Sequence, residues 1–540
     1  MNPEQGVSVG SEGRPVARQG AERSVIVRNV LANWIWYLLV VASGFVLPRF
    51  IDRSHGAELL GVWDFSWSLV AYISLLALAV SSAVQRYVAK YRAIGDWDAL
   101  NATTNTCLVL LLASSVVGLA VTVGLAALVP RLLPAAGADA MVAARRVVLV
   151  LGLCCAIQMP GGVFNAVVTG YERFDVFNII RGIRDFLLLV VMIALLFAGY
   201  GIVALACAKL CAEMLGYVAM LAAARRLCPQ LLISLRLFRW DVAKQMVGFG
   251  GKSILQDLAR SGVYQGNSLL LGYFLGPAAL AVFSRQRALV MHVMRFIKQY
   301  AHVFIPSSSA LYARRDVAAL QTLVIQSSKY ALYVTLPIML VLLIMGDLLV
   351  QVWMGAAYRA HGVLAILTVG HLLSVPQQGT YMILVGMGKH ALPALADLAA
   401  MLVSIGLCIT ILGLSDGSMA GVAVAIAVPV ALSGGVFVPL YACRVLDLSV
   451  RRYVRGTLPG PALTAIPFVG AILPARLLFD GSPWLALGVG LGVGGSVLAI
   501  TYWRWVLPPS LKSRITHNVL QLGRRTADEE GKAPVSSAGS

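Results

Sequence analysis

Apolar stretches of about 20 residues recur along the chain, and this pattern constrains its fold more than any other feature. Such a stretch, wound as a helix, crosses the roughly 30 Å hydrocarbon core of a bilayer. Charged residues are 12% of the chain, against roughly 25% in soluble domains. The sequence therefore predicts an all-α, polytopic membrane protein with about 14 transmembrane helices. The expected spans are 33–52, 63–84, 104–129, 146–170, 179–198, 201–223, 247–274, 278–304, 328–354, 362–387, 390–414, 417–442, 458–478 and 483–506.

Lys and Arg are distributed unevenly between the two sides that fourteen spans define. If the N-terminus is cytoplasmic, the cytoplasmic loops and tails hold 25 of these residues and the outer loops hold 5. Cytoplasmic loops of membrane proteins carry such an excess, so we expect both termini to be cytoplasmic. The net charge of +19 is explained by this placement. No basic nucleic-acid-binding module accompanies the charge, and we expect no nucleic-acid partner.

Two halves of the chain correspond at an offset of about 220 residues. Six spans separate the copies, which is an even number, so the repeats are parallel, as in transporters whose halves are related by an axis along the membrane normal. The sequence thus predicts two parallel six-helix repeats followed by two C-terminal helices. The matching segments are 56–63 with 276–283, 95–101 with 315–321 and, at an offset of 218, Gly170 with Gly388.

This organisation predicts a division of the chain into six parts. Two lobes of six helices are joined by a basic linker, and polar tails lie at both ends. The expected parts are a cytoplasmic tail (1–27), an N-lobe (28–223), a cytoplasmic linker (224–246), a C-lobe (247–442), two extra helices (458–506) and a cytoplasmic tail (507–540).

The eighth expected span is unusually basic. Arg287, Arg295 and Lys298 share a helical face of about 80°. Each such cation costs roughly 2.5–3.5 kcal/mol at the centre of a membrane helix. Intramembrane cations are tolerated where they face a bundle interior or a wet cavity, and there they mark a substrate pathway. We therefore expect a cationic, water-filled vestibule between the two halves.

The seventh expected span carries a polar stripe that faces the same vestibule in this interpretation. Guanidinium groups suit phosphate because their forked donors match its oxygens, so a diphosphate is the expected ligand. Trp36 and Tyr37 of the first span are candidates for stacking on sugars. Asp257 and Asp64 are the candidates for ion coupling. The candidate substrate-binding residues are Lys252, Arg260, Arg287, Arg295, Lys298, Gln256, Tyr264 and Asn267.

A simpler interpretation stays open for these charges. The cations could pair with Asp257, Asp64, Glu213 or other acids. Arg295 and Lys298 could also extend their charged ends to the cytoplasmic surface. In either case the charges would stabilise the fold and bind no substrate.

Several stretches resemble the polysaccharide transport branch of the multidrug/oligosaccharidyl-lipid/polysaccharide (MOP) exporter superfamily. The resemblance implies an inner-membrane flippase that moves an undecaprenyl-diphosphate-linked oligosaccharide by alternating access, for O-antigen, lipopolysaccharide or exopolysaccharide synthesis. Membrane lipid and polysaccharide polymerase or export machinery are the partners that it implies. The family's usual second-half tyrosine after the Leu-Gly turn is Phe283 here. The stretches are LPRFID (47–52), HGAELLGVW (55–63), QRYVAKYRAIGDWDALN (85–101) and LGYFLGPAALAVFSRQRAL (271–289).

Other functions are weighed against this one. A peptidoglycan-precursor flippase fits the helix count and the charge equally well, whereas a multidrug/cation antiporter predicts an anionic cavity. A lipid-embedded polymerase or ligase would need a large outer loop. We expect no enzyme, no cofactor and no metal, because no catalytic constellation or metal cluster can be assembled. The GxGxxG letters at 490–495 lie inside an apolar span, where they favour close helix packing.

Overall fold

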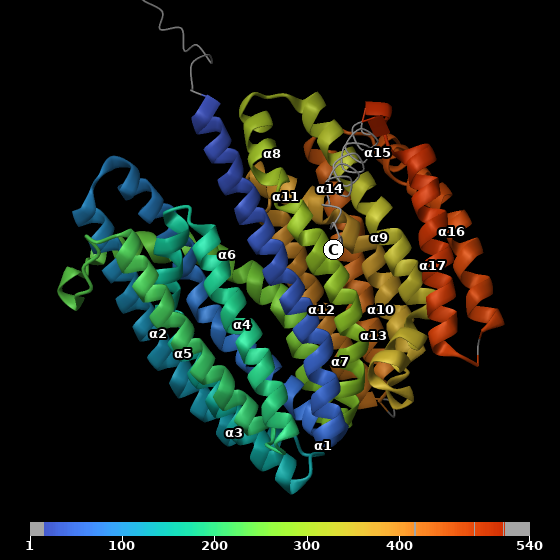
Figure 1. Cartoon of the computed structure of the whole chain (residues 1–540), viewed down its shortest axis with the longest axis horizontal. Helices are drawn as coiled ribbons and strands as arrows, with labels where there is room; N and C mark the ends of the chain where they lie inside the picture. The colour runs from blue at the N-terminus through green and yellow to red at the C-terminus, as the bar shows by residue number, and fades with distance from the viewer. Residues whose placement is uncertain (1–15, 415–416, 480, 511, 514–540) are drawn as a thin grey trace, which may run out of the picture. The chain divides into compact units, whose positions relative to one another are not determined.

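The computed structural model describes residues 16–414, 417–479, 481–510 and 512–513, apart from the side chains of 16–35, 76–83 and 247–257. Within these residues the backbone is helical and forms no strand, which confirms the predicted all-α class (Figure 1). Most of the two predicted tails, 1–15 and 514–540, lies outside the described residues.

The chain divides into two compact units: the first is Met1–His292, Trp353–Ser374 and Gly388–Phe437, and the second is Val293–Val352, Val375–Met387 and Val438–Ser540. The predicted lobe boundaries at 28–223 and 247–442 stay a prediction. The first unit holds α1 (Val16–Ile94), α2 (Trp97–Leu132), α3 (Ala138–Gly170), α4 (Phe174–Phe197), α5 (Ile202–Leu227), η1 (Leu235–Leu237), α6 (Trp240–Ser261), the π-helical turn η2 (Gly262–Gly266), most of α7 (Asn267–Ala301), η3 (Ala356–Tyr358), α10 (His361–Ser374), α12 (Ala391–Leu414), α13 (Met419–Val430) and η5 (Ala431–Phe437). The second holds the end of α7, α8 (Phe304–Ala313), most of α9 (Val317–Met354), η4 (Val375–Gln377), α11 (Gln378–Gly386), α14 (Val438–Val445), α15 (Val450–Thr457), α16 (Pro459–Leu478), α17 (Pro483–Thr501) and η6 (Tyr502–Val506).

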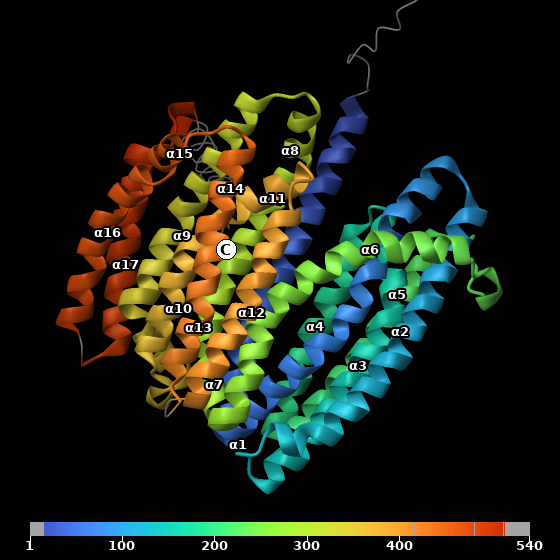
Figure 2. The same cartoon turned by 180° about the vertical axis from the view of Figure 1, so that it is seen from behind.

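Within the first unit, α3 is the central helix of a bundle. It packs against α1, α2 and α5, and Figures 1 and 2 show α2 to α5 side by side. Buried side chains of α3 such as Val147, Leu151 and Val163 form its core contacts. In the second unit α16 packs on α17. A Cβ at Gly490 would lie 2.7 Å from the side chain of Met345, so the predicted packing role of the 490–495 glycines is confirmed at this position.

The helices agree with the predicted spans. Each of the fourteen windows lies almost entirely on helical backbone. In the part of the chain that the structure describes, nine helices are both long enough and apolar enough to cross a membrane. α4 is not among them, because every stretch of it long enough to cross contains Arg181, Arg184 and Asp185.

Two glycines bend long helices in the same way at the predicted offset. Gly56 in α1 has φ 80° and ψ 174°, and Gly276 in α7 has φ 82° and ψ 170°. This region of backbone space is essentially restricted to glycine. Each corner separates two predicted spans, so the same turn is built twice, 220 residues apart. The predicted parallel repeat is therefore confirmed in the backbone.

Hydrogen bonds follow the same offset. Asp96 accepts from the amide of Ala99 at 2.9 Å, and Asp316 accepts from the amide of Ala319 at 2.9 Å. Both carboxylates cap the first turn of a helix, where free amide groups need acceptors. A second pair of hydrogen bonds also follows the offset of 220. The side-chain amide of Asn101 donates to the Gln230 carbonyl at 2.9 Å, and the side-chain amide of Gln321 donates to the Leu446 carbonyl at 2.8 Å.

The predicted match of Gly170 with Gly388 is wrong by two residues. α3 ends at Gly170 and α11 ends at Gly386. Two residues beyond each end the backbone turns to positive φ, at Glu172 (59°) and Gly388 (72°). The equivalent of Gly170 is therefore Gly386. Matching by residue identity failed because the first repeat makes the positive-φ turn with a glutamate.

We expect Gly56→Ala and Gly276→Ala each to destabilise the protein by about 1–3 kcal/mol, because a Cβ is strained in this region of φ and ψ. The measurement is the thermal unfolding midpoint of the purified protein in detergent. Gly124→Ala is the matched control, since Gly124 is helical and a Cβ there meets open space. Its midpoint should be equal or higher, because alanine favours helix more than glycine does. Equal midpoints for all three variants would contradict the proposed role of the corners.

Candidate functional site

Three predicted site residues meet in the first unit. The guanidinium of Arg287 donates to the backbone carbonyl of Tyr264 at 2.7 Å and to the Oγ of Ser268 at 2.5 Å. Arg260 lies four residues before Tyr264, and both guanidinium groups act electrostatically on the Tyr264 hydroxyl. The structure thus brings Arg260, Tyr264 and Arg287 together. Their role in substrate binding stays a prediction.

A buried histidine holds the Tyr264 side chain. The Tyr264 hydroxyl lies 3.1 Å from Nε2 of His371 in α10, and Nδ1 of His371 lies 2.8 Å from the carbonyl oxygen of Leu367. A carbonyl only accepts, so Nδ1 carries the proton, and Nε2 of the neutral ring accepts from the hydroxyl. His371 is fully buried. Tyr264 is therefore fixed by α10.

Arg260 is paired with an acid that the sequence did not indicate. Its Nε lies 3.2 Å from Oδ2 of Asp397 in α12, and Ser433 donates to the other carboxylate oxygen at 3.4 Å. Asp397 also acts on Tyr264, so two cations and one carboxylate surround this hydroxyl. Arg260 thus forms an ion pair with an acid, Asp397, and its role in substrate binding stays a prediction.

The remaining candidates of the seventh and eighth spans fall into three sets. Asn267 is fully buried, and its amide donates to the Ser404 Oγ at 2.8 Å, so it lies in a helix contact. Arg295 and Lys298 belong to the second unit, and their predicted role stays a prediction. The side chains of three candidates lie outside the described residues, namely Lys252, Gln256 and Asp257.

Asp64, a candidate for ion coupling, forms an ion pair. A terminal nitrogen of Arg285 lies 2.5 Å from its Oδ2 and 2.7 Å from its Oδ1. Arg285 is 5% exposed, and its Nε has no hydrogen-bond partner. Close by, the Tyr358 hydroxyl donates to Oδ1 of Asp52 at 2.5 Å. Asp64 is therefore paired with Arg285, a cation outside the predicted basic face, and its role in ion coupling stays a prediction.

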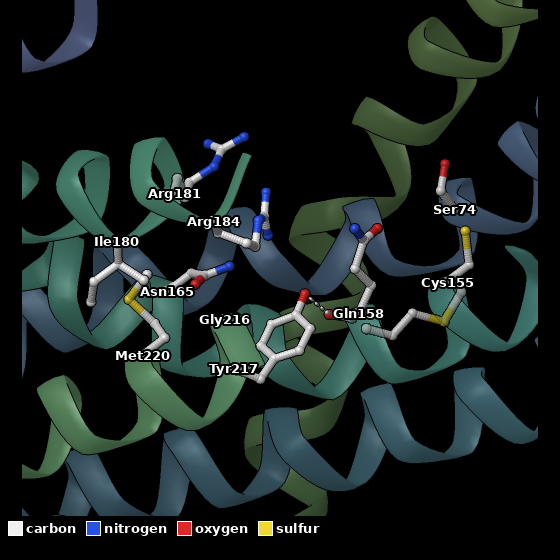
Figure 3. A pocket seen from close by; sticks show the side chains of 11 residues that line it. Ser74, Cys155, Gln158, Asn165, Ile180, Arg181, Arg184, Gly216, Tyr217 and Met220 are labelled. Carbon is white, nitrogen blue, oxygen red and sulfur yellow. Dashed lines mark hydrogen bonds between the residues drawn. The ribbon is translucent and has the colours of Figure 1, made fainter. Parts of the chain in front are cut away.

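A polar cavity of about 310 Å³ lies among α1, α3, α4 and α5 of the first unit. In Figure 3 the guanidinium groups of Arg181 and Arg184 lie above Asn165 and Tyr217. The Tyr217 hydroxyl donates to the Gln158 carbonyl at 3.3 Å. Arg184 lies ten residues into α4 and inside the expected span 179–198. We call this site the arginine pocket. It is lined by Ser74, Cys155, Gln158, Met159, Asn165, Ile180, Arg181, Arg184, Gly216, Tyr217 and Met220.

Salt bridges fix one arginine of the pocket. Arg184 contacts Glu213 at 2.7 Å and Asp185 at 2.7 Å, and Lys209 contacts Glu213 at 2.9 Å. Glu213 is 1% exposed, so two cations stabilise one buried carboxylate. Glu213 was a candidate partner for the cations of the eighth span; the partners that the described structure gives it are Arg184 of α4 and Lys209 of α5.

Arg181, the other arginine of the pocket, is held by aromatic rings. Its guanidinium carbon lies 4.2 Å from the centre of the Trp36 ring and 5.0 Å from that of Phe177. The Trp36 indole in turn donates to Asp185 at 2.9 Å. Within the described residues Arg181 forms no ion pair with a carboxylate. A guanidinium held by stacking keeps its N–H donors available, so Arg181 presents donors to the cavity.

Two glycines make room for the pocket. A Cβ at Gly161 would lie 2.0 Å from the Tyr217 ring, and a Cβ at Gly216 would lie 2.8 Å from the Arg184 stem. Tyr217 therefore lies directly on α3, and Arg184 crosses directly over α5. Pro160, which precedes Gly161, lies inside the continuous helix α3.

The arginine pocket was missed in the sequence, although a signal for it is present. Arg181, Arg184 and Asp185 fall inside the expected span 179–198, so the criterion that singled out the eighth span also singles out the fifth. The pairing of Arg260 with Asp397 had no such signal, because the two lie 137 residues apart.

The sequence profile of the family described as "Polysaccharide biosynthesis protein" matches residues 59–361. This range is more than half of the chain and contains the corner at Gly276, the arginine pocket and Arg287. The chain belongs to this family. No curated protein sequence matches it.

Comparison with solved structures shows the fold of the chain. An inward-facing multidrug resistance MATE family transporter of the MOP superfamily is 18% identical, with a TM-score of 0.65 over 79% of this chain and 99% of that chain. A MOP superfamily transporter from Pyrococcus furiosus, with a binding pocket of reverse polarity, is 17% identical, with a TM-score of 0.56 over 78% of this chain and 95% of that chain. This polysaccharide biosynthesis protein is thus a multi-pass membrane protein with the fold of a MOP transporter, as the sequence resemblance implied.

Proposed function

We propose that the protein is a flippase that moves an undecaprenyl-diphosphate-linked oligosaccharide across the bacterial inner membrane, for lipopolysaccharide, O-antigen or exopolysaccharide synthesis. The observation that supports it most is Arg181, a guanidinium inside a membrane helix bundle that is held by Trp36 and forms no ion pair with a carboxylate in the described residues. Intramembrane charge of this kind by default marks a substrate path.

The arginine pocket suits a phosphorylated sugar. Arg181 offers forked donors to phosphate oxygens, while the amides of Asn165 and Gln158 and the Tyr217 hydroxyl are hydrogen-bonding groups for a sugar. Three cations, counting Lys209, face two carboxylates in the pocket and around it, so one positive charge is left for an anion. A surplus of positive charge disfavours cationic drugs as cargo.

The group around Tyr264 supplies a second cationic site in this proposal. Arg260 and Arg287 are held by Asp397 and by the Tyr264 carbonyl, respectively. Arg295, Lys298 and Lys252 complete the phosphate path, with Gln256, Tyr264 and Asn267 as polar contacts. Asp257 is the remaining candidate for ion coupling, because Asp64 is paired with Arg285. The protein performs no chemistry on its cargo in this proposal, and polymerase or export machinery receives it.

The test is transport in proteoliposomes that contain an undecaprenyl-diphosphate-linked oligosaccharide. We expect the purified protein to make the labelled sugar of inner-leaflet lipid accessible to an impermeant lectin, at a rate well above that of protein-free vesicles. In cells, deletion should abolish surface polysaccharide, with accumulation of lipid-linked sugar and with viability retained.

Other outcomes would overturn the proposal in favour of a named alternative. Lethal depletion with accumulation of peptidoglycan precursor would support the peptidoglycan flippase. Normal surface polysaccharide together with increased sensitivity to cationic drugs would support a multidrug antiporter.

A further inference from the structure

An apolar groove of about 1000 Å³ runs along α4 and α5 of the first unit. This is the upper end of the roughly 300–1,000 Å³ range of small-molecule sites. Of its 17 lining residues, Arg184 is the only charged one. Several side chains along it, such as Leu187 and Leu215, are more than half exposed in the protein alone. In a membrane this groove therefore faces lipid.

The sequence of α5 explains the groove. Ala204, Ala208, Ala212 and Gly216 recur every four residues and line it. Residues at this spacing form one stripe on a helix, so α5 presents a shallow surface. α4 presents large side chains along the same groove, at positions that include Ile183, Leu187 and Val191. A wall of large side chains beside a floor of small ones leaves the concavity.

The groove joins the arginine pocket. Ile180, Arg184 and Gly216 line both. From Arg184 the groove extends along α4 as far as Leu195, which is about 16 Å at the helical rise. Charge is thus concentrated at one end and apolar surface at the other. This is the distribution of a phosphorylated lipid, with an anionic head and a long hydrocarbon chain.

We infer that the α4–α5 groove binds the hydrocarbon chain of a polyprenyl phosphate whose phosphate lies in the arginine pocket. The inference rests on the proposed function, because a lipid-linked cargo is what brings a chain and a phosphate together. Bilayer lipid is as apolar as the groove, so the chain gains little from apolar burial. The phosphate distinguishes this lipid from neutral ones, and the chain, held in the groove and the bilayer, keeps the head at a high local concentration beside Arg181 and Arg184, which free diphosphate lacks.

The experiment uses a diazirine-bearing analogue of undecaprenyl phosphate with the full-length protein in phosphatidylcholine nanodiscs, and mass spectrometry locates the crosslinks. We expect crosslinks on α4 and α5 at the groove. Unlabelled undecaprenyl phosphate at about ten times its Kd should lower the yield about tenfold, because only unoccupied protein reacts. Undecaprenol, phosphatidylglycerol and inorganic diphosphate at the same concentration should leave the yield unchanged.

Several results would overturn the inference. Equal competition by phosphatidylglycerol would identify a general lipid groove, equal competition by undecaprenol would exclude a role of the phosphate, and competition by inorganic diphosphate would place the affinity in the head alone. Crosslinks away from α4 and α5 would place the chain elsewhere. The crosslinking map is made on the wild-type protein, so it tests the inference even if a variant fails to fold.

A pair of variants links the groove to transport. Ala208→Trp fills the groove floor and should lower both crosslinking and transport, whereas Val218→Trp, exposed on α5 outside the groove, should change neither. Normal transport by Ala208→Trp would contradict the groove inference but not the proposed function. Groove crosslinking without transport by the wild-type protein would sink the proposed function and leave a lipid-binding site.

Discussion

Asp64→Ala is expected to destabilise the protein by about 3–5 kcal/mol, because it leaves a buried guanidinium without its carboxylate. Arg285 is 5% exposed and has no second acid among its hydrogen-bond partners in the described structure. The measurement is the thermal unfolding midpoint in detergent, together with the amount of folded protein in the membrane. Asp139→Ala removes an exposed acid from the first turn of α3 and serves as the control, with an effect within about 0.5 kcal/mol.

A double variant separates pairing from ion coupling. Replacement of a buried ion pair by apolar residues is often neutral for stability, so Asp64→Leu with Arg285→Met should recover most of the lost stability. If Asp64 serves only the pair, the double variant also transports. Recovered stability with abolished transport would show instead that Asp64 has the ion-coupling role first considered for it.

Arg181→Gln is expected to reduce transport about 10- to 100-fold while the amount of folded protein stays normal. Hydrogen bonds to charged groups are worth about 1.5–3 kcal/mol, and each 1.4 kcal/mol is tenfold in affinity. Stability should be retained because the variant breaks no ion pair in the described structure. The measurement is the lectin assay in proteoliposomes at matched protein content.

Variants of two further arginines serve as comparisons for Arg181→Gln. Arg225→Gln, exposed in the last turn of α5, should transport normally. Arg184→Gln removes the partner of Glu213 and should lower the amount of folded protein, so its transport defect has a different origin. Normal transport by Arg181→Gln would remove the arginine pocket from the substrate path.

The architecture could be predicted from the sequence because it depends on properties that are local in the chain. Apolar length sets the spans, and the requirement for glycine at Gly56 and Gly276 sets the corners. Glu172 shows the limit of that reasoning, since a residue other than glycine makes an equivalent turn and the match to Gly388 was misplaced by two residues.

The site was predicted only in part because its partners are distant in the chain. Arg285 and Arg287 are two residues apart on one helix, yet one pairs with Asp64 and the other binds a backbone carbonyl of its own half. Which neighbour each meets depends on how helices pack, and spacing within one helix does not determine this. The arginine pocket, by contrast, is visible in the sequence as charged residues in the apolar window 179–198, although the eighth span is more basic.

The ion pair between Asp64 and Arg285 joins the two repeats at nearly equivalent places. At the offset of 220, Asp64 corresponds to Ser284 and Arg285 corresponds to Phe65. A chimaera of two first halves would set a carboxylate against a phenyl ring, and one of two second halves would set a guanidinium against a serine. The first repeat thus supplies the carboxylate and the second repeat supplies the guanidinium, so neither repeat can substitute for the other.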